Sequence, residues 1–145
     1  MARSRRLSPL LKLAEARERN AVQVVLRARQ QLHDYEEKLA ELRTYRQEYG
    51  RSFKAAQAHA TTGKQLQEYQ NFMHQLNRGI TLLAEKIAGQ KQLNLRDERL
   101  WVKAKKRSDA LDKLVDKLRG MERNFRLTLE ANEIDEHSQH RKAEL

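Results

Sequence analysis

Apolar residues recur at heptad spacing along almost the whole chain, and this repeat limits the possible fold more than any other feature. In the first arm, thirteen of the fifteen positions on the repeating a/d seam are apolar or aromatic, over seven heptads. Three or four heptads are enough to indicate a coiled coil. These seam residues are Leu7, Leu11, Ala14, Glu18, Ala21, Val25, Ala28, Leu32, Tyr35, Leu39, Leu42, Arg46, Tyr49, Phe53 and Ala56.

A second heptad arm runs from Leu66 to Leu129 and keeps one phase throughout. Fourteen of its nineteen seam positions are apolar or aromatic. The seam positions are Leu66, Tyr69, Met73, Leu76, Ile80, Leu83, Ile87, Gln90, Asn94, Asp97, Trp101, Ala104, Ser108, Leu111, Val115, Leu118, Glu122, Phe125 and Leu129. Three consecutive seam positions in its middle are polar, namely Gln90, Asn94 and Asp97. A seam that becomes polar without changing phase indicates one continuous helix with a weaker central part.

The segment between the arms, residues 58–64, has no large apolar residue, and it contains a β-branched pair and Gly63. Glycine readily adopts the left-handed conformation that ends a helix, so we expect Gly63 to help form the turn. The sequence thus predicts a first helix over about 7–57, a loop over about 58–64 and a second helix over about 65–138. Beyond the second helix we expect a frayed C-terminal tail.

A loop this short makes the two arms antiparallel, which predicts an all-α fold: a long antiparallel two-helix coiled-coil hairpin. The whole chain, residues 1–145, would form a single coiled-coil domain. Facing residues then have numbers that sum to about 122, so Phe53 faces Tyr69. By the same rule Asn94 faces Ala28.

The composition narrows the class of protein in the same direction. The chain has 5 Gly and 1 Pro in 145 residues, too few for the turns of a β protein. It has no Cys, which excludes disulfides, thiolate metal sites and Cys nucleophiles. No apolar run approaches the roughly 18 residues of a membrane span, and the basic N-terminus lacks the features of a signal peptide. We therefore expect a soluble cytoplasmic protein.

Enzyme chemistry is not indicated, because a two-helix hairpin offers no pocket in which catalytic residues could converge. Glu133/His137 and Glu136/His140 are spaced as i, i+4 pairs, but they lie in a polar terminal segment rather than a bundle core. We expect no catalytic residues, no metal and no cofactor.

The net charge of +10 favours acidic protein surfaces, anionic lipid or nucleic acid as partners. Basic residues are dispersed among acidic ones, and the densest run is Lys103-Ala-Lys105-Lys106-Arg107. A basic-region zipper would need a denser cluster placed before a parallel seam. The run is therefore either solvated surface or a patch for an acidic partner.

Some large apolar residues lie beside the seam rather than on it. Phe72 is one, and it either contacts a partner or packs against its own partner helix. A stripe of off-seam residues in the second arm is also left unmatched by the hairpin, which indicates a partner helix. The members of this stripe are Leu93, Leu100, Leu114 and Met121.

The order of several motifs resembles the FliJ family, the small coiled-coil component of the bacterial flagellar type III export apparatus. The motifs are Leu13-Ala14-Glu15 at the helix start, Leu42-x-x-Tyr45-x-x-Glu48-Tyr49 before the loop, Tyr69-Gln70-x-Phe72 with Leu76 after it, Trp101 followed by a basic stretch, and Asp135-Glu136. Together these motifs cover most of the chain.

The resemblance implies a non-enzymatic stalk similar to the central shaft of rotary ATPases. It implies that the open end of the hairpin engages the hexameric flagellar export ATPase, and we expect Lys105, Lys106 and Arg107 to face that ATPase. It also implies that the segment after the loop binds the cytoplasmic domain of the membrane export-gate protein. The gate-binding residues carried over are Phe72, Leu76 and Gly79, where the family often has Ala in place of Gly79.

The resemblance further implies a role in handling export chaperones and a location at the inner-membrane export apparatus, with no nucleic acid as partner. Two other classes of protein share the features derived from the residues: a basic coiled coil associated with nucleic acid, and a helical stalk subunit of a rotary ATPase. Phosphate-driven binding would weaken steeply with salt, whereas a contact between protein surfaces would weaken much less.

Overall fold

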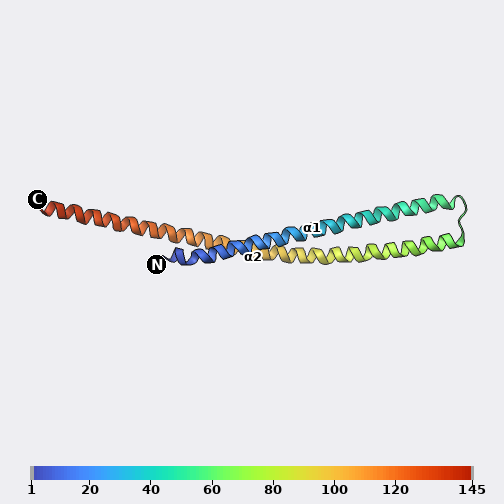
Figure 1. Cartoon of the computed structure of the whole chain (residues 1–145), viewed down its shortest axis with the longest axis horizontal. Coiled ribbons are helices and arrows are strands. Elements are labelled where there is room, and N and C mark those ends of the chain that lie inside the picture. Colours follow the sequence, from blue (N-terminus) through green and yellow to red (C-terminus); the bar gives the residue numbers. More distant parts are fainter. Residues whose placement is uncertain (1, 145) are drawn as a thin grey trace. The chain divides into compact units, whose positions relative to one another are not determined.

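Two long helices connected by a short segment make up the fold in our computed structural model, which describes residues 2–144 (Figure 1). Helix α1 spans Arg3–Gln57, 55 residues, and helix α2 spans Gly63–Glu144, 82 residues. No strand occurs within residues 2–144. The prediction of an all-α antiparallel helical hairpin is confirmed.

Both helices extend further than the periodicity indicates. Helix α1 begins at Arg3 and encloses Pro9, although proline has no N–H to donate to the carbonyl of Arg5. Arg5 is exposed, so water can satisfy that carbonyl. Helix α2 continues to Glu144, and its last turn carries Arg141 and Lys142, whose positive charges are favourable at a helix C-terminus.

The connecting segment, residues 58–62, turns the chain through Ala60 rather than through Gly63. Ala60 has a φ of 76°, whereas Gly63 has no positive φ and is the first residue of α2. The expectation that Gly63 provides the left-handed residue is therefore wrong. A capping box explains why Gly63 can be helical: Gln65 N–H donates to Thr62 Oγ1 at 3.2 Å, and Thr62 N–H donates to Gln65 Oε1 at 3.1 Å.

The chain divides into two compact units, and α1 and α2 each contribute a segment to both. We call Gln23–Arg99 the loop unit, and residues 2–22 together with 100–144 the terminal unit. The expected single domain stays a prediction.

The loop unit is held by a small apolar core between its two helical segments. Leu39, Ile80 and Ile87 are buried at its centre. Partly buried side chains surround them, namely Leu32, Tyr35, Leu42, Leu76, Leu83 and Ala84. These residues are the predicted seam residues or direct neighbours of the seam, so heptad spacing accounts for this core.

The facing pairs in the loop unit follow the predicted register. The rings of Phe53 and Tyr69 stack with centroids 3.8 Å apart and an interplanar angle of 6°. Asn94 Nδ2 donates a hydrogen bond of 3.2 Å to the backbone carbonyl of Ala28. Both pairs have numbers that sum to 122, as predicted from the loop position.

The polar part of the seam is satisfied by local hydrogen bonds. Asn94 is buried, and its Oδ1 accepts a hydrogen bond of 2.8 Å from Gln90 Nε2. Asp97 is buried as well, and its Oδ1 accepts a hydrogen bond of 3.4 Å from Arg96. Buried polar groups need partners, and these contacts reduce the free-energy cost of the polar seam.

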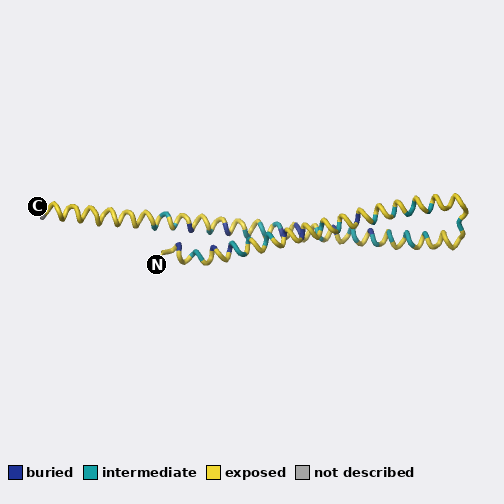
Figure 2. Tube along the Cα trace, turned by 45° about the horizontal axis from the view of Figure 1, so that its top comes forward, coloured by how far each residue is buried: buried dark blue, intermediate teal, exposed yellow. Residues whose placement is uncertain are grey.

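In the terminal unit, Leu11 and Ala14 of α1 and Val115 of α2 are buried at the interface between the two segments. Residues 123–143 of α2 are exposed at every position, which Figure 2 shows as a continuous exposed stretch toward the C-terminus. Burial in this unit is therefore confined to the part of α2 that has α1 beside it. Within residues 2–144, neither helix contains a stretch long and apolar enough to cross a membrane.

The left-handed Ala60 generates a stability prediction. The left-handed conformation costs a non-glycine residue about 1–2 kcal/mol, and part of this is offset by the greater flexibility of glycine in the unfolded chain. We expect Ala60→Gly to stabilise the protein by up to about 1 kcal/mol in urea unfolding. The matched control Ala56→Gly, in the last turns of α1, should instead destabilise it by up to about 1 kcal/mol. A loss of stability in Ala60→Gly would contradict the assigned turn geometry.

Candidate functional site

Aromatic rings from both helices gather near the connecting segment. Tyr49 lies at their centre, with ring centroids 4.5 Å from Phe72 and 5.5 Å from Tyr69. Tyr45 contacts Phe72 edge-on at 6.1 Å. Aromatic pairs at such distances add stability beyond the area they bury. The cluster thus fixes the two helices together close to the turn.

The three residues expected to bind the export gate lie along α2 in the loop unit. Phe72 is half-buried within the aromatic cluster, and Leu76 packs on the apolar core. Gly79 is half-buried too, yet a Cβ built at this position would meet no atom within 4 Å. The structure therefore shows Phe72 packing on its own partner helix. Part of the ring, and the open space at Gly79, remain available to another protein.

The basic run expected to face the ATPase lies on α2 in the terminal unit. Lys105, Lys106 and Arg107 are all exposed, and none forms an ion pair with another residue in the range 2–144. Lys105 Nζ lies 5.9 Å from the centroid of the Trp101 ring, a cation–π contact. The run thus presents positive charge that the chain itself does not neutralise.

Trp101 is half-buried, and its indole Nε1 is buried without a hydrogen-bond partner among the described residues. A buried N–H without a partner lowers stability by about 1–3 kcal/mol.

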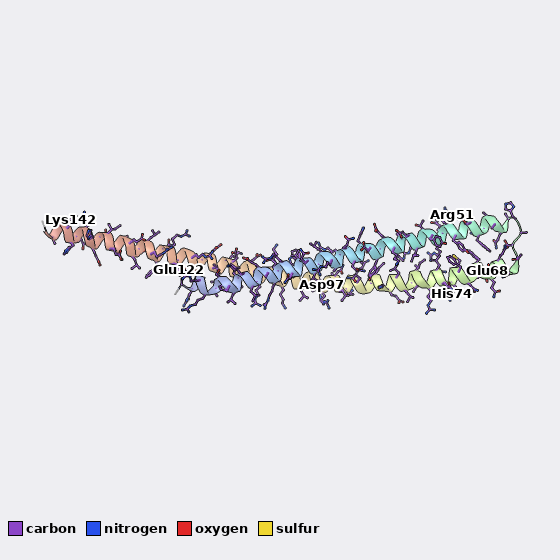
Figure 3. All side chains as sticks on the ribbon, viewed as in Figure 1. Arg51, Glu68, His74, Asp97, Glu122 and Lys142 are labelled. Atoms are coloured by element: carbon purple, nitrogen blue, oxygen red, sulfur yellow. The ribbon has the colours of Figure 1, made fainter. Side chains whose placement is uncertain are left out.

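A contact between Ser4 and Glu122 joins the start of α1 to α2 in the terminal unit; Glu122 is labelled in Figure 3. Ser4 Oγ donates a hydrogen bond of 2.6 Å to Glu122 Oε2, and the backbone N–H of Ser4 donates one of 3.1 Å to Oε1. The first N–H groups of a helix have no partner within the helix, so this carboxylate caps α1 from the neighbouring helix.

The hydrogen bonds from Ser4, first from its side chain and then from its backbone, hold the pKa of the Glu122 carboxyl below its usual value of about 4.5. The nearby cations of Arg126 and Arg119 lower the pKa further, whereas partial burial opposes the shift. Hydrogen bonds to the charged form favour that form, so Glu122 is ionised at neutral pH.

Sequence reasoning missed this capping contact. The available signal was a glutamate on the seam of α2 where the partner arm was expected to have ended. Because the predicted first helix began near residue 7, no serine N–H was expected opposite Glu122.

Among residues 2–144, no group of three or more His, Asp or Glu is arranged to hold a metal ion.

The family model of the flagellar FliJ protein matches residues 3–144 of the chain. The chain belongs to the FliJ family. No curated protein and no solved structure matches the chain. The resemblance predicted from the sequence is thereby confirmed, and the chain is a flagellar export component of a non-catalytic family.

The Ser4–Glu122 contact generates a pH prediction. Because the pKa of Glu122 is lower in the folded protein than in the unfolded chain, the contact contributes stability above about pH 4.5. This contribution is lost as the pH falls below 4.5 and through the folded pKa. We expect amide exchange in the first turns of α1 to accelerate over that window in the wild type. In Glu122→Gln it should already be fast at pH 7.

The control for this experiment is Glu133→Gln, which removes an exposed carboxylate from the same helix. This variant should keep the wild-type pH profile at the start of α1. Equal protection of the first turns in Glu122→Gln and wild type at pH 7 would contradict the capping role.

Proposed function

We propose that this chain is a non-enzymatic stalk that binds the hexameric flagellar export ATPase, promotes its activity and couples it to the membrane export gate. The observation that carries the proposal is the exposed run Lys105, Lys106 and Arg107, whose charges have no ion-pair partner among residues 2–144. Membership of the FliJ family, a family of flagellar export components, supports it.

The geometry of a stalk inside a ring of six ATPase subunits favours an electrostatic contact. A single asymmetric helical pair must present different faces to six identical subunits, so a shape-specific pocket cannot match all of them. Unpaired cations act over distances near the Debye length, about 8–10 Å at physiological salt, and do not require one fixed geometry. The basic run is suited to such a contact.

The gate contact is proposed for Phe72, Leu76 and Gly79. The exposed part of the Phe72 ring offers an aromatic anchor, and the missing side chain at Gly79 lets another backbone approach closely. Leu76 lies between them and supports this surface from the core. With these contacts the protein would work at the inner-membrane export apparatus, and its export role would include the handling of export chaperones.

The ATPase contact is tested by reversing the basic run. We expect Lys105→Glu/Lys106→Glu/Arg107→Glu to reduce stimulation of the export ATPase at least tenfold, because three attractive charges become repulsive. Helix content by circular dichroism should not change, since all three side chains are exposed.

The matched control reverses Arg51, Lys54 and Lys64, which are exposed on the loop unit; Arg51 is labelled in Figure 3. This control changes the net charge by the same amount and should retain stimulation. Equal stimulation by the two triple variants would show that the basic run is only solvated surface.

The gate contact is tested at Gly79, because truncating Phe72 would also remove ring contacts within the hairpin. Gly79→Glu places a side chain in open space and replaces a helical glycine, so the melting temperature should stay equal or rise. Binding to the cytoplasmic domain of the gate protein should weaken at least tenfold in a pull-down or titration.

Gly89→Glu is the control for this experiment, since Gly89 is also helical and its missing Cβ faces open space. It should leave gate binding unchanged. If Gly79→Glu binds the gate domain as well as Gly89→Glu does, the gate-binding assignment is wrong.

A further inference from the structure

The terminal unit contains an apolar groove that runs between its two helical segments. Four residues of each helix line the first hollow of the groove, and a second hollow, lined mainly by α2, continues it. The apolar residues that line the two hollows are Leu10, Leu13 and Ala14 of α1 and Leu100, Ala104, Ala110, Leu111 and Leu114 of α2.

The walls of this groove are unusually exposed for leucine. Leu10, Leu13 and Leu100 keep 51%, 48% and 54% of their surface accessible, and Leu114 keeps 42%. Ala14 on the floor is almost fully buried, at 4%. Contiguous exposed apolar surface with a polar rim marks an interaction site rather than ordinary solvated surface.

Three cations border the groove: Arg17 on α1, and Lys103 and Arg107 on α2. None of them forms an ion pair with another residue in the described part of the chain. The groove therefore combines an apolar centre with a positive rim that no carboxylate of this unit neutralises.

We propose that this groove binds an amphipathic helix of another protein, whose apolar face is flanked by acidic residues. The apolar side chains of that helix would fill the space between the four leucines, and its carboxylates would pair with Arg17, Lys103 and Arg107. This is the helix-in-groove mode of recognition. Leu100 to Leu114 spans about 21 Å of helix, which accommodates roughly four turns of a docked helix.

The small residues that line the groove explain how a third helix could approach closely. Ala14, Ala104 and Ala110 leave room between the leucine walls, so the docked helix would complete a three-helix arrangement. The acidic stretch of this same chain, within residues 130–136, cannot occupy the groove of its own molecule, because it belongs to the continuous helix α2 that forms one wall.

The test uses the full chain and a fluorescent peptide probe of about 20 residues, long enough to form a helix on docking. The probe has leucines on one helical face and glutamates on both flanks. A second peptide has lysines in place of the glutamates, and a third has the composition of the first in scrambled order. We expect the wild type to bind the glutamate probe at least tenfold more tightly than either of the others in an anisotropy titration.

Charge reversal then assigns the binding to the groove. Arg17→Glu/Lys103→Glu should weaken the glutamate probe at least tenfold and strengthen the lysine probe, a gain that unfolding cannot produce. Lys12→Glu/Lys113→Glu is the control, since both lysines are exposed in the same unit and neither lines the groove. Leu10→Ala/Leu13→Ala should weaken the glutamate probe while helix content is retained.

Three results would overturn the proposal. The first is equal binding of the scrambled peptide, which would show attraction by charge alone. The second is equal binding by the Arg17→Glu/Lys103→Glu variant and its control. The third is self-association of the wild-type chain in sedimentation that is abolished by Leu10→Ala/Leu13→Ala, which would assign the groove to a second copy. None of these measurements involves the ATPase or the gate, so the proposed stalk function can fail or hold independently.

Discussion

Each unit of this protein depends on a single interface, the antiparallel contact between one segment of α1 and one of α2. Leu39, Ile80 and Ile87 in the loop unit are buried only because the opposite helix covers them. A helix with one partner can hide one stripe of its surface, so the hydrophobic stabilisation is modest and depends on keeping that stripe in register. A shift of either helix would expose these residues and break the facing pairs.

Polar contacts within this interface mainly select the alignment of the two helices and add little to net stability. The hydrogen bond from Asn94 to the carbonyl of Ala28 is available only when these two residues face each other. The paired hydrogen bonds from Ser4 to Glu122 likewise require the first turn of α1 to lie beside that carboxylate. Buried polar groups at seam positions usually lower stability but select one alignment. These contacts occur in both units, so each unit carries its own alignment signal.

The interface was largely predictable from the sequence, because heptad spacing is a local property and the short loop sets the register. The Phe53–Tyr69 and Asn94–Ala28 pairs follow from these two facts alone. The left-handed Ala60 was not predictable, because the Thr62–Gln65 capping box makes Gly63 the first residue of α2 and leaves the turn to the residues before it. One wall of the groove, which contains Leu100 and Leu114, was predicted as part of the unmatched stripe on the second arm. Its other wall, Leu10 and Leu13, was not predicted, because these residues lie off the seam of the first arm and heptad spacing does not determine how off-seam side chains pack.

An interface that uses one stripe of each helix leaves the remaining faces free for partners, which separates binding from stability at most positions. Lys106 and Leu13 are exposed away from the seam, so changes there should affect contacts more than folding. Phe72 is different, because its ring lies 4.5 Å from that of Tyr49 and is only half-buried. A partner that holds Phe72 in this position would also stabilise the aromatic contacts between the helices, by mass action on the folded state. Any binding at this surface would therefore be coupled, through one side chain, to the stability of the loop unit.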